Sequence, residues 1–79
     1  TKAELESIIS RSPAYSMEYS FEVLKDRFEL GEETIANDKT YSNVYANQMI
    51  KDDDKIKDFV HKYNIHWDWV DKYWNEDQI

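Results

Sequence analysis

The chain has 79 residues, of which 17 are acidic and 10 basic, with one Gly, one Pro and no Cys. This length allows a single domain over residues 1–79, and the lack of Cys excludes disulfides and thiolate metal sites. The net charge of −7 disfavours binding to nucleic acid or to an anionic membrane and favours basic partners. No apolar run approaches the length of a membrane span, and no targeting segment opens the chain. We therefore expect a cytoplasmic protein, located in the host cytoplasm if its origin is viral.

The first half of the chain predicts a short helix followed by a longer one. Residues 2–10 have helical spacing, and their apolar face would be formed by Leu5, Ile8 and Ile9. Ser12 followed by Pro13 is typical of a helix N-terminus. A second helix should therefore run over about residues 13–28, and Gly31 should provide the break after it.

The second half repeats this order of elements. A short helix is expected over residues 32–37, and Asp38 is a suitable N-cap for a longer helix over residues 39–51. Three consecutive aspartates, residues 52–54, then favour a helix start because carboxylates complement its positive end. A final helical stretch should end near residue 75.

A 26-residue offset aligns the two halves. It matches the Tyr-Ser-x-x-Tyr stretch that begins at Tyr15 with the one that begins at Tyr41. Trp69 and Tyr73 repeat the same aromatic spacing in a third, diverged copy. The sequence thus predicts an all-α fold of two to three stacked short-helix/long-helix units, over about residues 2–28, 32–51 and 54–75. The four tyrosines of the two matched stretches would interlock neighbouring units; they are Tyr15, Tyr19, Tyr41 and Tyr45.

These residues also carry a resemblance to a known family. Residues 8–52 resemble a short helical repeat of phage and large-virus proteins, whose units have a Tyr-Ser-x-x-Tyr-Ala core, a Val-Ile-Lys ending and an Arg-aromatic-x-x-Gly-Glu linker. The matching positions here are Tyr15-Ser16, Tyr19-Ser20, Val23-Leu24-Lys25, Arg27-Phe28 and Gly31-Glu32. The chain departs from the pattern at Asp26, where the family usually has Gly, and throughout its last third. The resemblance implies a stack of helices and a viral origin.

In its size, its acidity and this repeat, the chain resembles the Arn family of anti-restriction proteins from T-even phages. That resemblance implies a DNA mimic that inhibits the modification-dependent nuclease McrBC and acts as a dimer or a larger homo-oligomer. It would make the partner a host DNA-binding protein.

No constellation in the chain points to an enzyme. His61 and His66 are five residues apart, which does not place them on one face of a helix, so we expect surface or half-buried imidazoles rather than metal ligands. A calcium loop starting at Asp52 would need Gly at its sixth position and Glu at its twelfth, where Lys57 and Tyr63 stand. We expect no catalytic residue, no metal and no cofactor.

The acidic residues are the first candidate site. Residues 31–54 contain six acidic and two basic side chains and form the most electronegative third of the chain. Any one of these acids most simply keeps the surface soluble, but as a set they could occupy a DNA-binding cleft. The candidate mimic residues are Glu18, Glu22, Asp26, Glu29, Glu32, Glu33, Asp52, Asp53, Asp54 and Asp58. The first four recur at helical spacing and predict one acidic ridge.

The C-terminal aromatic residues are the second candidate site. Trp67 and Trp74 share one helical face, whereas Trp69 and Tyr73 share another. Because a domain this small cannot bury both faces, the exposed face would serve in self-association.

Two further functions remain open on these observations. One is a helical-repeat module that binds a partner protein through an aromatic or concave face. The other is an immunity-type inhibitor that covers an active site without resembling DNA. An alanine scan would separate them from mimicry, which predicts many small effects rather than a few large ones.

Overall fold

A computed structural model describes residues 1–75 of the chain, and every regular element within them is helical. The predicted all-α fold is confirmed. The elements are α1 (Lys2–Ile9), α2 (Pro13–Tyr19), η1 (Ser20–Leu24), α3 (Glu29–Ala36), α4 (Lys39–Tyr45), η2 (Ala46–Ile50), α5 (Asp53–Lys62), η3 (Asp68–Val70) and α6 (Asp71–Asn75). Within residues 1–75, no helix combines the length and apolar character that a membrane crossing requires.

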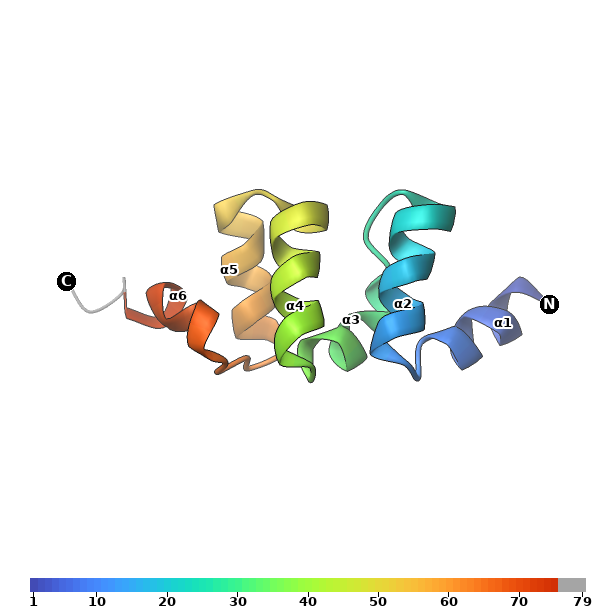
Figure 1. The fold of residues 1–79 in the computed structure, drawn as a ribbon, viewed down its shortest axis with the longest axis horizontal. Helices are drawn as coiled ribbons and strands as arrows, with labels where there is room; N and C mark the ends of the chain where they lie inside the picture. Colours follow the sequence, from blue (N-terminus) through green and yellow to red (C-terminus); the bar gives the residue numbers. More distant parts are fainter. Residues whose placement is uncertain (76–79) are drawn as a thin grey trace.

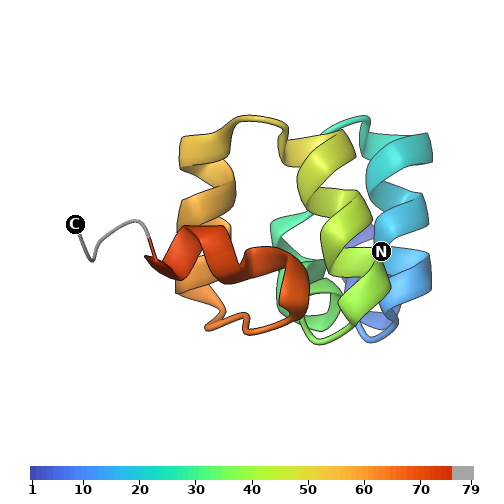
Figure 2. The same cartoon turned by 60° about the vertical axis from the view of Figure 1, so that its left-hand side comes forward.

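The helices form an elongated array with extents of 48 × 19 × 18 Å. Figure 1 shows α2, α4 and α5 standing in a row, with α3 beneath them and with α1 and α6 towards the two ends. Figure 2 brings the C-terminal end forward and shows α6 running across the lower part of the array. We call α1 to η1 unit 1, α3 to η2 unit 2, and α5 to α6 unit 3.

The starts of the two longer helices agree with the sequence prediction and repeat each other. The hydroxyl of Ser12 accepts a hydrogen bond from the backbone N–H of Tyr15 at 3.2 Å. Twenty-six residues later, the carboxylate of Asp38 accepts one from the N–H of Tyr41 at 2.8 Å. Both caps satisfy an N–H group that the helix itself leaves unpaired.

The end of the first of these helices differs from the prediction, whereas the second ends at Ile50, next to the predicted residue 51. The helix that begins at Pro13 does not continue to Phe28: it widens into the π-helical η1 and stops at Leu24. Lys25 then adopts a left-handed conformation (φ 53°), while the Ser20 hydroxyl donates a 2.6 Å hydrogen bond to the carbonyl of Asp26. The second long helix, α4, widens in the same way into η2, and the residue after it, Lys51, has φ 68°. A left-handed residue after the last turn is a common helix terminator.

The sequence had suggested that Gly31 breaks a helix. In the structure Gly31 instead lies buried inside α3. A Cβ atom at this position would lie 2.5 Å from Oγ of Ser16 and 2.7 Å from a ring carbon of Phe28. Gly31 therefore allows α3 to approach α2 more closely than any larger residue would. The short helix accordingly begins at Glu29 rather than at residue 32.

The hydrophobic core lies mainly between units 2 and 3. Its buried members come from α3 onwards and include Ile35, Tyr45, Ile56, Phe59, Val60, Ile65, Val70 and Tyr73. Unit 1 contributes less, and the expected apolar face of the first helix is largely uncovered, because Leu5 and Ile8 remain exposed. Only Ile9 of that face is half-buried.

The tyrosine pairs divide in the same way in both units. The second member of each pair, Tyr19 and Tyr45, is buried, as expected for residues that interlock the helices. The first member is more open: Tyr41 is half-buried, and Tyr15 is 66% exposed. The interlock prediction is therefore wrong for Tyr15.

Candidate functional site

Nine of the ten candidate acidic residues are exposed, and they are distributed over all three units. Glu18 and Glu22 lie on α2 and η1, Glu29 and Glu33 on α3, and the aspartates of residues 52–58 at the start of α5 and along it. The carboxylate of Asp52 also caps α5 by accepting from the N–H groups of Asp54 and Lys55. Apart from Asp52 and Asp26, whose carboxylates accept backbone N–H groups, these exposed acids can interact with a basic surface without losing a hydrogen bond to the backbone.

The predicted ridge of four acidic residues does not form on one helix. Glu18 and Glu22 follow each other along α2 and η1, but the chain then turns at Lys25. Asp26 therefore lies in the connecting turn, and Glu29 begins the next helix. The sequence spacing was correct for a helix that continued to residue 28, and the left-handed residue interrupts it.

Glu32 is the exception among the ten residues, because it is completely buried. Its carboxylate forms a two-pronged ion pair with the guanidinium of Arg27, at 2.7 and 2.9 Å. It also accepts a 2.6 Å hydrogen bond from the hydroxyl of Tyr45 and a longer one from Tyr63. Glu32 is thus a structural residue at the centre of the array and is not part of the acidic surface.

This cluster shifts the proton affinities of the groups around Glu32. Hydrogen bonding to Glu32 raises the pKa of Arg27 above its ordinary value. Burial, together with the hydrogen bond to Glu32, raises the pKa of Tyr45, and burial beside the same carboxylate raises that of Tyr63. Each partner is therefore held in the protonation state that stabilises the carboxylate.

The C-terminal aromatic side chains contact the rest of the chain on both predicted faces. The indole N–H of Trp69 donates to the hydroxyl of Ser42 at 3.2 Å, and that of Trp67 donates to the carbonyl of Ala36 at 3.0 Å. Trp74 donates to the carbonyl of Ile65 at 2.7 Å, and Tyr73 is buried in the core. The expectation that one whole face would be exposed is wrong, because each face packs against a different earlier element. Trp67 is the most exposed of the four.

The two histidines lie on either side of Trp74. The ring centroids of His61 and Trp74 are 4.2 Å apart, those of His66 and Trp74 are 4.7 Å apart, and all three rings are nearly parallel. Nε2 of His61 lies 2.8 Å from the carbonyl oxygen of Tyr73, and Nε2 of His66 lies 2.9 Å from the side-chain oxygen of Asn64. Within residues 1–75, no three His, Cys, Asp or Glu side chains come together as metal ligands would.

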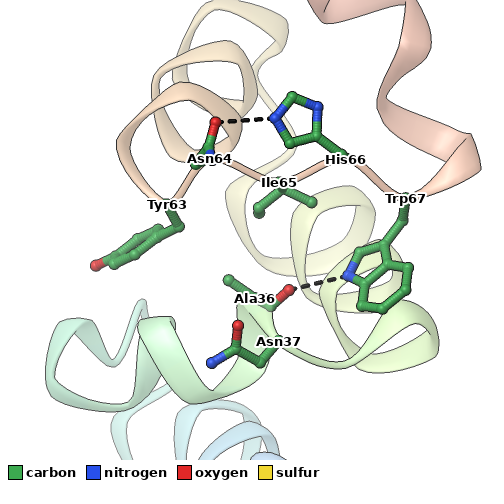
Figure 3. Close-up of a pocket in the computed structure, with 7 residues that line it drawn as sticks. All are labelled: Ala36, Asn37, Tyr63, Asn64, Ile65, His66 and Trp67. Atoms are coloured by element: carbon green, nitrogen blue, oxygen red, sulfur yellow. Dashed lines mark hydrogen bonds between the residues drawn. The ribbon is translucent and has the colours of Figure 1, made fainter.

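A hollow of about 180 Å³ lies between the end of α3 and the loop that follows α5. Figure 3 shows the residues that line it. The loop from Tyr63 to Trp67 forms one side, and Ala36 with Asn37 forms the other. The indole of Trp67 closes part of it through its hydrogen bond to Ala36. His66 is the one titratable imidazole among these described lining residues, and it is already paired with Asn64, so the hollow does not bring together an acid–base pair.

A larger hollow, of about 370 Å³, lies between the long helices of units 1 and 2, and we call it the α2–α4 groove. Its half-buried apolar lining consists of Met17, Phe21, Tyr41 and Val44. Its exposed lining consists of Ala14, Glu18, Glu22 and Gln48. The groove therefore combines an apolar floor with two carboxylates.

Reasoning from the sequence did not single out the groove, although Glu18 and Glu22 were among the candidate acids. The signal that could have found it is a difference between the aligned units. Met17 and Phe21 correspond, at the 26-residue offset, to Asn43 and Asn47. Met17 packs against the hydrophobic core, but Phe21, a half-buried aromatic residue at a position where the repeat also accepts asparagine, suggests a role besides helix packing.

Comparison with known proteins identified no relative: no family model, no curated protein and no solved structure matches this chain. The function must therefore be argued from the chain's own fold, charges and grooves.

Proposed function

We propose that this protein is a DNA-mimic inhibitor, which uses its acidic surface to occupy the DNA-binding cleft of a host protein. The resemblance to Arn makes the modification-dependent nuclease McrBC the first target to test, and the cytoplasm of an infected cell the place of action. The acids would act as a set, by electrostatic attraction and steric occupation. No residue would have a catalytic role.

The observation that carries this proposal is the distribution of exposed carboxylates along an elongated body. Nine candidate acids are exposed on an array 48 Å long and 19 × 18 Å across. They are spread over all three units instead of surrounding one pocket. A rod that carries negative charge along its length is the simplest electrostatic imitation of a duplex.

The charge density also indicates that one copy is a sparse imitation. B-DNA carries one charge per about 1.7 Å of axis, so 48 Å of duplex would present about 28 charges. The net charge of a single chain, −7, falls well below that number. We therefore propose that the inhibitor acts as a dimer or larger homo-oligomer, in which the acidic surfaces of the copies add together.

The experiment that tests mimicry is displacement from the target by DNA. The chain, labelled with a fluorophore, is bound to McrBC, and a methylated duplex is then added in increasing amounts. Mimicry predicts that the duplex displaces the chain completely, and that binding weakens as salt rises because exposed charges are screened. If the nuclease binds duplex and chain together without loss of affinity, the proposal fails.

A matched set of variants separates collective charge from a local anchor. Neutralising Asp53, Asp54 or Asp58 singly should weaken binding only slightly. Neutralising all three should weaken binding by about the sum of the three single losses of binding free energy. The control neutralises a base, Lys55→Gln, on the same helix, and should strengthen binding slightly. A single dominant acid would contradict mimicry.

The α2–α4 groove favours a second candidate, a helical-repeat module that binds a protein partner through a local surface. In that case charge changes on α5 should have little effect, and changes at Phe21 or Val44 should remove binding. An alanine scan read against the same partner distinguishes the two candidates.

A further inference from the structure

The α2–α4 groove lies between two helices that stand roughly parallel in Figure 1. One wall comes from α2 and η1 of unit 1, and the other comes from α4 and η2 of unit 2. The lining residues lie within 14–22 on one wall and within 41–48 on the other, which at a rise of about 1.5 Å per residue gives walls about 12 Å long. A groove of this length accommodates about two turns of another helix.

The apolar lining of the groove is not a requirement of the repeat. The unit 1 residues Met17 and Phe21 are replaced in unit 2 by Asn43 and Asn47, at equivalent places on the equivalent helix. There the side-chain amide of Asn47 donates hydrogen bonds to the backbone carbonyl and the side-chain oxygen of Asn43. The same helix therefore forms with polar residues at these positions. Met17 also packs against the hydrophobic core, whereas Phe21 is half-buried at the groove and is the unit 1 side chain best placed to serve a ligand.

The charges at the groove differ between the units as well. Glu18 and Glu22 are exposed and four residues apart along the wall from unit 1. Their equivalents in unit 2 are Val44 and Gln48, which are uncharged. Among the described residues that line the groove, none carries a positive charge. An apolar floor beside two carboxylates complements a ligand that has apolar side chains next to basic ones.

We propose that the α2–α4 groove binds an amphipathic helix of a partner protein, with large apolar side chains on one face and Lys or Arg beside them. The apolar face would lie on Met17, Phe21 and Val44, and the basic residues would pair with Glu18 and Glu22. This is the helix-in-groove mode of recognition, in which apolar residues at i, i+3 or i+4 and i+7 supply the affinity. The inference does not rest on DNA mimicry, since a duplex backbone offers charges but no apolar ridge.

The test uses two synthetic 14-residue peptides and the full-length protein. The first contains only Leu and Lys, spaced so that Leu forms one helical face; the second has the same Lys residues with every Leu replaced by Gln. We expect the Leu/Lys peptide to bind at least tenfold more tightly by fluorescence anisotropy and to gain helical circular dichroism on binding. Equal binding of the two peptides would overturn the proposal, since charge alone would then explain it.

Variants taken from the repeat itself locate the binding. The double change Met17→Asn with Phe21→Asn introduces the residues that unit 2 carries, and it should reduce Leu/Lys peptide affinity at least tenfold. The control, Asp53→Asn with Asp54→Asn, removes two acids far from the groove and should reduce affinity less than threefold. If the double asparagine variant does not fold, Glu18→Gln with Glu22→Gln replaces it, because both carboxylates are exposed. Undiminished affinity in the folded groove variant would place the peptide elsewhere and overturn the proposal.

Discussion

The hydroxyl of Tyr45 donates a 2.6 Å hydrogen bond to the buried carboxylate of Glu32 and accepts one of 3.0 Å from the backbone N–H of Phe28. The same pairing occurs 26 residues earlier, where Tyr19 donates to Glu6 at 2.7 Å. The two pairs differ in their surroundings. Glu6 is only half-buried, whereas Glu32 is enclosed and also binds Arg27. The second pair should therefore contribute more to stability than the first.

Removal of the buried carboxylate should be strongly destabilising. Glu32→Ala leaves Arg27 without its partner, and breaking a buried ion pair in this way costs about 3 kcal/mol. Because the guanidinium of Arg27 retains some exposure to solvent, we expect the loss of unfolding free energy not to exceed this value. Urea unfolding followed by circular dichroism measures the change.

The neighbouring residue supplies the control for that prediction. Glu33 lies next to Glu32 on α3 but is exposed, so Glu33→Ala should change the unfolding free energy by less than about 0.5 kcal/mol. Losses of similar size in the two variants would show that the cluster does not stabilise the array.

Gly31→Ala should also destabilise the protein, although the position is helical. In an open helix, replacing Gly by Ala stabilises by about 1 kcal/mol. Here the added Cβ would lie 2.5 Å from Oγ of Ser16, and overpacking of this kind costs about 1–3 kcal/mol. A lowered melting temperature is the expected result. A melting temperature raised by Gly31→Ala would contradict the predicted contact.

Replacing Lys51 by glycine should stabilise the protein. With φ 68° and ψ −43°, and with the N–H of Asp52 donating to the carbonyl of Ile50 at 2.8 Å, Lys51 is the central residue of a γ-turn. This turn is strained for any residue with a side chain, so Lys51→Gly should stabilise the protein by about 1 kcal/mol. Lys55→Gly, in the first turn of α5, is the matched control and should destabilise the protein. Calorimetric unfolding of both variants checks the sign.

Stability should fall at high pH because of the buried tyrosine cluster. Burial and the hydrogen bond to Glu32 raise the pKa of Tyr45, and burial also raises that of Tyr63, above the ordinary value of about 10. Above pH 10 the unfolded chain therefore releases tyrosine protons that the folded chain retains, so the unfolding free energy decreases as pH rises. Below pH 10 this contribution is fully present.

The measurement is the urea midpoint between pH 8 and pH 11. Tyr45→Phe should reduce the steepness of the decline above pH 10, in addition to lowering stability at every pH. Tyr15→Phe changes an exposed tyrosine and should leave the steepness unaltered. Identical slopes in wild type and Tyr45→Phe would refute the assignment.

The helical class and the starts of the helices could be predicted from the sequence because they depend on local signals. The linear sequence contains all of these signals: periodic apolar residues, the N-caps at Ser12 and Asp38, and the 26-residue offset. The ends of the helices were not predictable in the same way. No glycine marks the positions with positive φ, which are occupied by Lys25, Lys51 and Asn64, and the single glycine serves a close helix contact instead.

The candidate site was only partly accessible from the sequence for a related reason. Exposure of nine acids follows from their polarity, but the burial of Glu32 depends on Arg27 and Tyr45, which tertiary packing brings to it. The likeness to the phage repeat included Arg27 and Glu32 without indicating that they form an ion pair. The groove was missed because its walls come from two different units.

The position of Glu32 has a consequence for how the array loses its structure. A stack whose units contact only their neighbours can melt one unit at a time, because the stability of each unit and the energy of each interface are separate contributions. Glu32 binds Arg27 from the linker after unit 1, Tyr45 from its own unit and Tyr63 at the end of α5. Melting the linker, unit 2 or unit 3 would in each case remove a partner from the same buried carboxylate. The chain should therefore unfold in a single cooperative transition, behaving as one body in spite of its repetitive construction.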